Sequence, residues 1–186
     1  MSSHHIVREN QEPALLVEDF HALSEEYLGQ ILEWSPTIIT NKENVDYFLA
    51  EDIKFDILYA LEIDYAQEEI KHITPQSSFL EDSINYLIDN QFKAVNILSK
   101  SLHSFFIDYA NRINIVVFAV GIRYALFKSK YEKWKIKGQK MYVDVAYIKS
   151  FTGLKYLDNN VFEVDQDGFV FLDFNSDNFL FVGEEI

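Results

Sequence analysis

The chain has 186 residues, enough for one large domain or two small ones, and 48% of them are hydrophobic, enough to bury a core. A formal net charge of −14 argues against nucleic-acid and anionic-membrane partners, because both repel a polyanion. The lack of cysteine excludes disulfides and thiolate metal sites. No apolar run approaches the ~18 residues of a membrane span, and the amino terminus lacks the apolar core of a signal peptide, so we expect a cytoplasmic protein.

Short apolar runs alternate with helical patterns as far as residue 120. Extended segments are expected at Pro13–Val17, Thr37–Thr40, Asp56–Leu61, Lys71–Thr74, Lys93–Leu98 and Ile113–Val120. Helices are expected after Ser24, around Val45–Leu49, after Ser78 and over Leu102–Asn111. Repeated strand–helix–strand units predict an α/β fold with a mostly parallel, Rossmann-like sheet flanked by helices.

The stretch Thr74–Phe79 stands between a short strand and a helix, a position at which α/β sheets often bind ligands. Yet none of its side chains is charged. Ser78 and Glu81 instead fit a capping box, in which the Ser78 hydroxyl accepts from the Glu81 amide and the carboxylate reaches back. We therefore interpret this stretch as a helix cap.

From residue 122 the hydrophobic pattern changes to period two. The six lysines of Lys128–Lys140 surround Tyr131 and Trp134, and indicate a linker or an edge segment. Strands are expected at Met141–Tyr147, Phe169–Phe174 and Phe179–Val182, the last two forming a hairpin whose apolar faces should both be covered. We predict an α/β domain over residues 1–121, followed by a small antiparallel β domain over residues 122–186.

No phosphate-binding glycine loop, zincin histidine spacing or nucleophile elbow occurs in the sequence. Glu62 and Asp64 follow a strand and alternate, so their carboxylates could point the same way and hold Mg²⁺ with a substrate phosphate. Glu68 and Glu69 could complete such a set of ligands. The alternative is a solvated acidic loop, which spacing alone favours because exposure is the ordinary state of Asp and Glu.

Several stretches resemble a Bacteroidetes-type branch of the thiamine pyrophosphokinases: "SSHHIVRENQEPALLV", "EYLGQILEWSP", "AVNIL" and "YEKWKIKGQKMYV". The resemblance covers most of the chain and implies an α/β catalytic domain followed by a β-rich domain. It also implies the transfer of diphosphate from ATP to thiamine with Mg²⁺, by a homodimer whose sites lie between subunits.

The positions that correspond to the family's motifs carry other residues. Where the resemblance implies an Asp-Gly pair after the second strand, this chain has Lys42 and Glu43. A Gly-Asp-Phe-Asp motif falls on residues 60–63. A shift of one residue instead brings Glu62 and Asp64 into that motif, which keeps two acids but no glycine.

The motifs further along the chain are altered in the same way. An Asp-x-Thr-Asp motif falls on the end of the uncharged loop, so that Gln76 and Phe79 stand where the family has aspartates. His103 is the visible remnant of an Arg-x-Asp-His motif. Asn159-Asn160 is a distant echo of the Ser-Asn motif that binds thiamine in the family.

These substitutions predict a catalytically inactive homologue, with no catalytic residues and no cofactor, that acts by binding or regulation. Phosphoryl transfer depends on metal ions and positioned charges, and removing one such group can cost ~3–4 kcal/mol of transition-state stabilisation. The expected ligand is a thiamine-like small molecule. Phe79, Phe105 and Phe106 could line its pocket or a protein interface, although core packing is favoured.

Two alternatives stay open. The first is an active thiamine diphosphokinase, which would need ATP and Mg²⁺ and would use Glu62 and Asp64 as replacement metal ligands. The second is a structural subunit that pairs with an intact paralogue.

Overall fold

The structure is a computed structural model that describes residues 12–62 and 70–186. Its secondary-structure elements run in the order β1 (Ala14–Val17), η1 (Phe20–Ala22), α1 (Glu25–Leu32), β2 (Ile38–Asn41), η2 (Lys42–Asn44), α2 (Val45–Ala50), β3 (Ile57–Tyr59), β4 (Lys71–Ile73), α3 (Phe79–Asp89), β5 (Ala94–Leu98), α4 (Phe106–Tyr109), β6 (Asn114–Ala119), β7 (Ile122–Lys128), β8 (Lys130–Lys135), β9 (Lys140–Tyr142), η3 (Val145–Tyr147), β10 (Ile148–Thr152), β11 (Leu154–Asp158), β12 (Val161–Val164), β13 (Gly168–Phe174) and β14 (Phe179–Glu185). The predicted strands before residue 120 are all present, as are the helices expected after Ser24, around Val45–Leu49 and after Ser78, several with shorter bounds.

A large sheet runs through the described residues in the order β11-β12-β9-β14-β7-β6-β5-β1-β2-β3-β4. The half from β6 to β4 is parallel, and the half from β7 to β11 is antiparallel. A smaller antiparallel sheet has the order β10-β13-β8. The predicted α/β class and the smaller antiparallel sheet are therefore confirmed.

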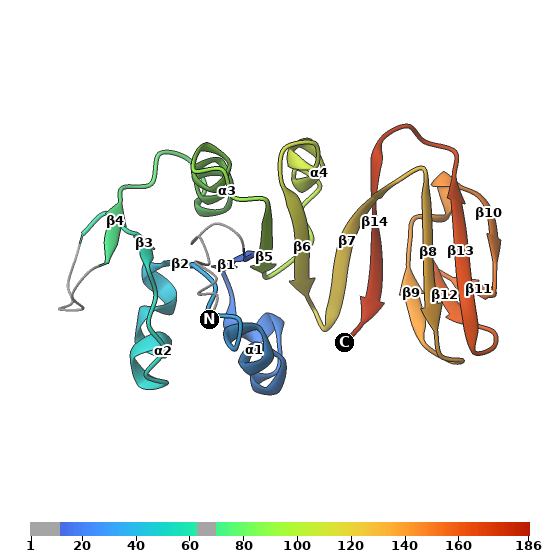
Figure 1. The fold of residues 1–186 in the computed structure, drawn as a ribbon, viewed down its shortest axis with the longest axis horizontal. Helices are drawn as coiled ribbons and strands as arrows, with labels where there is room; N and C mark the ends of the chain where they lie inside the picture. Colours follow the sequence, from blue (N-terminus) through green and yellow to red (C-terminus); the bar gives the residue numbers. More distant parts are fainter. Residues whose placement is uncertain (1–11, 63–69) are drawn as a thin grey trace, which may run out of the picture.

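Helices cover both faces of the parallel half, with α3 and α4 above the sheet and α1 and α2 below it in Figure 1. Alternate residues of each central strand serve the two sides, so Leu16 of β1 packs in the core under α3 and Leu15 in the core over α1 and α2. Ile84 and Leu87 anchor α3, and both are fully buried.

The predicted helix caps are confirmed. The Ser78 hydroxyl accepts from the Glu81 amide at 3.2 Å and donates to the Glu81 carboxylate at 2.7 Å. The Ser24 hydroxyl accepts from the Tyr27 amide at the start of α1. Both helices carry acidic residues in their first turn, where the helix dipole favours negative charge.

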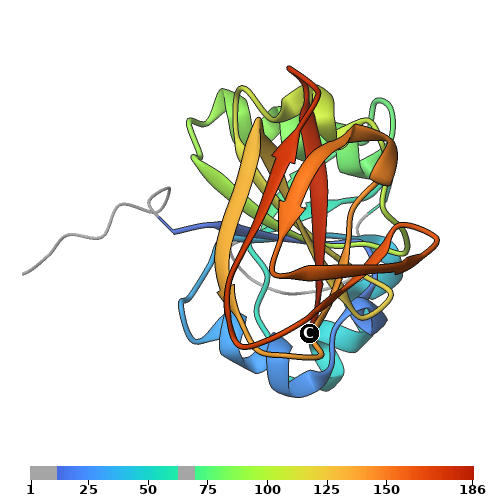
Figure 2. The same cartoon turned by 90° about the vertical axis from the view of Figure 1, so that its right-hand side faces the viewer.

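The antiparallel strands continue the large sheet beyond residue 121. A two-residue turn of Val120 and Gly121, both with positive φ, joins β6 to β7, and the boundary predicted at residue 121 falls at this turn. The three-stranded sheet packs against the antiparallel half across a third core, which includes Phe162 and Leu172. Figure 2 looks onto this end of the molecule. The division into two domains stays a prediction.

The segment Lys128–Lys140 is not a linker. It forms the end of β7, all of β8 and the start of β9, and β8 is an edge strand of the small sheet. Its period of two is hidden in the sequence because inward positions carry the lysines Lys133 and Lys135. Both lysines pair with one carboxylate, that of Glu184 on β14.

A charged cluster links β8 to β14 between the two sheets. Glu184 is 7% exposed, and its carboxylate accepts from Lys135 at 2.7 Å, from Lys133 at 2.8 and 3.1 Å, and from the Tyr131 hydroxyl at 2.8 Å. Burial alone would raise the pKa of Glu184, but the hydrogen bonds from the two lysines and Tyr131 outweigh it and lower that pKa to about 2. The same carboxylate and burial raise the pKa of Tyr131.

Three further expectations for local structure are wrong. The strand predicted over Met141–Tyr147 ends at Tyr142, and Val145–Tyr147 is a 3-10 turn. The helix predicted over Leu102–Asn111 is reduced to α4, flanked by i→i−3 bonds such as that from the Phe106 amide to His103. The strands β13 and β14 belong to different sheets, so they form no hairpin.

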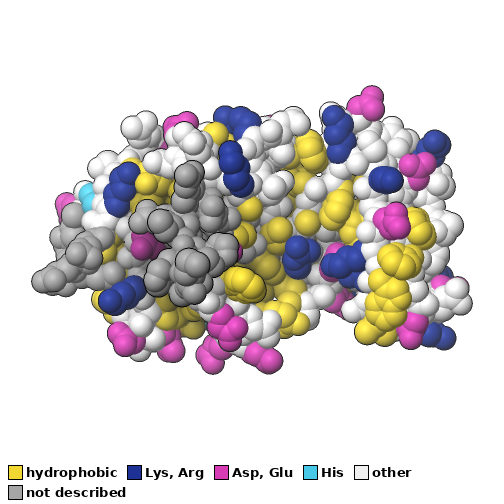
Figure 3. Space-filling view, in the orientation of Figure 1, with side chains coloured by type: hydrophobic (Ala, Val, Ile, Leu, Met, Phe, Trp, Pro, Cys, Tyr) yellow, Lys and Arg dark blue, Asp and Glu magenta, His cyan; other side chains and the backbone are white. Residues whose placement is uncertain are grey.

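One face of β13 lies open. Phe169 is 59% exposed and Phe171 is 41% exposed, whereas Val170 and Leu172, which alternate with them, are buried. Figure 3 shows a column of hydrophobic side chains over this end of the molecule. The expectation that both apolar faces would be covered is therefore wrong for the described structure. No helix among the described residues is long and apolar enough to cross a membrane.

Candidate functional site

The order of the parallel strands defines a switch point between β1 and β5. β1 pairs with β2 on one side and β5 on the other, so the chain builds outward to β4 and then returns across β1. In open α/β sheets ligands bind beyond the carboxyl ends of the strands at such a point. The loops in question begin at Glu18 after β1 and at Ser99 after β5.

The carboxylate of Glu18 spans this switch point. Glu18 Oε2 accepts from the Ser99 hydroxyl at 2.7 Å and from the Lys100 amide at 3.1 Å. The backbone amides of Glu18 and Asp19 both donate to the Leu98 carbonyl. The next carboxylate, Asp19, accepts from the His21 amide at 3.0 Å and caps η1. Both acids at the end of β1 thus serve as acceptors within the protein.

The loop after β2 is hydrogen-bonded to the end of β1. The Asn44 amide donates to the carbonyls of Val17 and Glu18 and to the side-chain oxygen of Asn41. Lys42 and Glu43 lie in the exposed turn η2. Glu43 lies 3.8 Å from the ammonium group of Lys100, in a pair too exposed to contribute much to stability.

The loop before α3 is held by Asp82, which sequence reasoning did not single out. Its carboxylate accepts from the Gln76 amide at 2.6 Å, from the Ser77 amide at 3.0 Å and from the Ser77 hydroxyl at 2.6 Å. Partial burial acts to raise the pKa of Asp82, but these hydrogen bonds outweigh it and lower the pKa below its usual value. Gln76 itself is exposed, and Phe79 packs on the Tyr59 ring with a centroid distance of 5.7 Å.

His103 lies in the segment between β5 and α4. Its ring contacts those of Phe105 and Phe106, with centroid distances of 5.4 and 5.7 Å, and its Nε2 lies 3.3 Å from the Ser101 hydroxyl. Phe106 is fully buried in the core under α4, and Phe105 is partly buried against it. The preference for core packing of these two aromatic side chains is confirmed.

The described residues do not test the predicted metal ligands, because only Glu62 is among them. Glu62 is exposed just after β3. Asp64, Glu68 and Glu69 lie outside the described residues. Residues 12–62 and 70–186 contain no group of three His, Cys, Asp or Glu side chains that could hold a metal ion.

A cavity of about 360 Å³ lies between the α4 region and the antiparallel strands. Its lining residues are Leu102, Ile107, Tyr124, Tyr142, Val143, Asp144, Tyr147, Asn159, Asn160, Leu180 and Phe181. Four of these residues are aromatic and four are aliphatic, and Asp144 supplies a carboxylate. We call this the α4-side cavity. It includes the Asn159-Asn160 pair that the resemblance associates with thiamine binding.

Hydrogen bonds fix the loop that presents Asp144 and Tyr147 to the α4-side cavity. The Val145 amide donates to the Asn160 side chain at 3.0 Å, and the Asn175 amide donates to the Tyr147 carbonyl at 3.0 Å. Asp144 Oδ1 accepts from the Ala146 amide, while its Oδ2 makes no hydrogen bond with the described residues. The remaining oxygen can therefore serve a ligand.

Part of this site could have been found from the sequence. Glu18 directly follows an apolar strand, which is the position that the strand-end rule selects. Asp82 lies in the first turn of a capped helix, where an acid usually has only a structural role. Asp144 carried no signal, because its segment was interpreted as a regular strand.

No protein-family model matches the sequence, and no curated protein matches it. Solved structures do match the fold. A protein from Lactobacillus plantarum gives a TM-score of 0.65 at 13% identity, over 93% of this chain and 97% of that one. Yeast thiamin pyrophosphokinase gives 0.64 at 11% identity, over 98% and 88%. The thiamine pyrophosphokinase of Bacillus subtilis gives 0.59 at 12% identity, over 92% and 97%.

The chain has the thiamine pyrophosphokinase fold. The match extends over nearly the whole length of both chains in each comparison, so it includes the parallel half and the antiparallel strands together. The expectation drawn from the sequence stretches is thus confirmed for the fold. In this chain the acids at the switch point, Glu18 and Asp19, are engaged in internal hydrogen bonds.

Proposed function

We propose that the protein is a catalytically inactive thiamine pyrophosphokinase homologue that binds a small aromatic cation of the thiamine kind in the α4-side cavity. The ligand class is taken from the thiamine pyrophosphokinases among the structures with this fold, and the α4-side cavity is the candidate position. The observation that carries the proposal is the use of the available carboxylates. Glu18 and Asp19 each give one oxygen to donors of the protein itself, and Asp144 lines the cavity with one oxygen that makes no hydrogen bond with the described residues.

The internal bonds of Glu18 and Asp82 oppose phosphoryl transfer. A magnesium site needs carboxylate oxygens that are open to the metal and the substrate phosphates. Ser99 and Lys100 occupy one oxygen of Glu18, and the loop of Gln76 and Ser77 occupies both oxygens of Asp82. A metal bound through the engaged oxygens would compete with these hydrogen bonds.

The α4-side cavity suits an aromatic cation. Rings of Tyr124, Tyr142, Tyr147 and Phe181 offer stacking surfaces and the attraction of a π face for positive charge. Asp144 supplies the opposite charge. The cavity volume lies within the range of small-molecule sites, roughly 300 to 1,000 Å³. The homodimer implied by the resemblance also stays a prediction.

Isothermal titration of thiamine into the protein without ATP tests the proposal. We expect a binding heat, and we expect Asp144→Asn to weaken binding about tenfold, because about 1.4 kcal/mol of charge attraction is lost. The control is Asp165→Asn, since Asp165 is an exposed acid outside the cavity lining, and it should leave the affinity within about twofold. The absence of heat with thiamine, thiamine diphosphate and ATP would leave only a protein-interaction role.

A further inference from the structure

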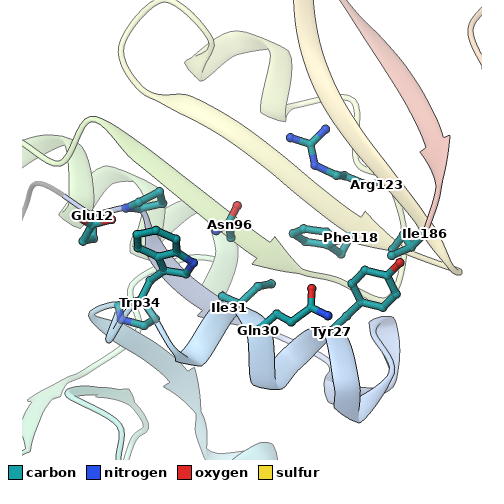
Figure 4. Close-up of a pocket in the computed structure, with 11 residues that line it drawn as sticks. Glu12, Tyr27, Gln30, Ile31, Trp34, Asn96, Phe118, Arg123 and Ile186 are labelled. Atoms are coloured by element: carbon teal, nitrogen blue, oxygen red, sulfur yellow. The ribbon is translucent and has the colours of Figure 1, made fainter. Parts of the chain in front are cut away.

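A second cavity, of about 510 Å³, lies on the opposite face of the large sheet. It lies between α1 and the part of the sheet formed by β5, β6 and β7, and we call it the α1-side cavity (Figure 4). Arg123 and Tyr124 are consecutive on β7, so their side chains point to opposite faces. Arg123 lines the α1-side cavity, and Tyr124 lines the α4-side cavity.

The walls of the α1-side cavity are apolar and open to solvent. Trp34, just after α1, is 70% exposed, and Tyr27 is 40% exposed. Phe118 of β6 and Ile31 of α1 complete the apolar surface. Figure 4 shows these side chains arranged along a channel between α1 and the sheet. A tryptophan left open above a hollow of this size is typical of a surface that a flat ligand covers.

Two polar groups in the α1-side cavity have no partner within the described residues. Asn96 lies on the central strand β5, and its side-chain amide makes no hydrogen bond there. Arg123 is half-buried and makes neither a hydrogen bond nor an ion pair with residues 12–62 or 70–186. Both side chains are only partly buried, so their donors are free to bond water or a ligand in the cavity.

Glu184, the acid that neighbours Arg123 across the sheet, already has other hydrogen-bond partners. Arg123 pairs in register with Phe118 on β6 and with Glu184 on β14, so the three side chains share one face. Glu184 gives its oxygens to two lysines and Tyr131 instead. Glu12 also lines the cavity, but Figure 4 places it at the end away from Arg123, beside Trp34. The Arg123 end is therefore the cationic end.

We propose that the α1-side cavity binds a small organic anion with a flat apolar body. The flat body lies against Trp34 and Phe118, and the anionic group, a carboxylate or sulfonate, accepts hydrogen bonds from the guanidinium of Arg123. Guanidinium groups suit this task because their planar fork matches a carboxylate and they also stack on rings. Asn96 contributes a further donor. This site is distinct from the α4-side cavity and does not depend on the function proposed for it.

The probes are 1-anilinonaphthalene-8-sulfonate, a flat aromatic anion, and N-phenyl-1-naphthylamine, its neutral counterpart. We expect both to bind the native full-length chain with enhanced fluorescence. Arg123→Gln should weaken binding of the sulfonate about tenfold, the equivalent of about 1.4 kcal/mol, and leave the neutral probe within about twofold. Trp34→Ala should weaken both. Arg112→Gln is the matched control, because Arg112 is an exposed arginine on the other face, against Tyr109.

Circular dichroism in the near ultraviolet, measured on every variant, shows whether the fold is retained. Equal affinity of the sulfonate for the native protein and Arg123→Gln, with both folded, would overturn the proposal. Equal losses of affinity for the two probes would also overturn it, because the charge of Arg123 would then have no part in binding. Should Arg123→Gln fail to fold, Arg123→Lys replaces it. This variant keeps the charge but loses the planar fork, and an intermediate loss for the sulfonate alone is expected.

Discussion

Glu184→Gln is expected to lower the free energy of unfolding by about 3 kcal/mol, because breaking a buried pair leaves a buried charge without its partner. Lys135 is only 6% exposed and loses the sole carboxylate that it contacts in the described structure. Lys133 is about half exposed and can turn to solvent. Chemical denaturation at pH 7 measures the difference.

The contribution of Glu184 also depends on pH. Its pKa in the folded protein is about 2, below the usual 4.5, so the carboxylate stabilises the folded state above pH 4.5. That stabilisation is lost as the pH falls from 4.5 towards 2. The stability difference between the native protein and Glu184→Gln should therefore be constant near neutral pH and shrink over this acidic range.

The neighbouring residue provides the control for this experiment. Glu185 is also at the end of β14, but its side chain is 45% exposed, and it contacts the Tyr142 hydroxyl and, at 3.7 Å, Lys140. Glu185→Gln should change stability by less than about 1 kcal/mol. Equal effects of the two substitutions, or a difference for Glu184→Gln that does not change in acid, would contradict the role assigned to the cluster.

Gly183→Ala is expected to destabilise the protein by about 2 kcal/mol and to weaken ligand binding in the α4-side cavity. A Cβ at position 183 would lie 2.6 Å from the Tyr124 ring and 2.9 Å from the Ile122 side chain. Neither distance is tolerated, so the Tyr124 ring must move. Because that ring lines the α4-side cavity, its displacement alters the surface on which the aromatic ligand would stack.

Gly29→Ala is the matched substitution. A Cβ there meets nothing within 4 Å, and Gly29 lies inside α1, where alanine is favoured over glycine by about 1 kcal/mol. Gly29→Ala should therefore raise the melting temperature and leave thiamine titration unchanged, while Gly183→Ala lowers both stability and affinity. Unchanged affinity in a folded Gly183→Ala protein would show that the position of Tyr124 does not matter for the site.

The parallel half of the fold could be predicted because its local signals agree. Strands such as Ile113–Val120 are continuous apolar runs, and Ser24 and Ser78 mark helix starts that the structure retains. The antiparallel half was predicted less well, because charged residues take inward positions there. Lys133 and Lys135 look like solvated side chains until Glu184, about 50 residues away, is seen to pair with them.

The candidate site was predictable only in part, for a related reason. Lys42 begins η2 directly after β2, Gln76 lies in the loop after β4, and Phe79 begins α3, so all three follow strands of the sheet as expected. The hydrogen bonds of Glu18 and the place of Asp144 at the cavity could not be deduced, because they depend on contacts between distant segments. Glu18 reaches Ser99 across 81 residues, and Asp144 reaches the cavity only because its strand ends early.

Formation of AMP from ATP tests the central claim most directly. Highly purified protein, incubated with thiamine, ATP and Mg²⁺, is expected to release no AMP above the rate of a blank without protein, although it binds thiamine. Turnover that is coupled to thiamine consumption and lost in Glu62→Gln combined with Asp64→Asn would contradict the claim. It would make the protein an active diphosphokinase with replacement metal ligands.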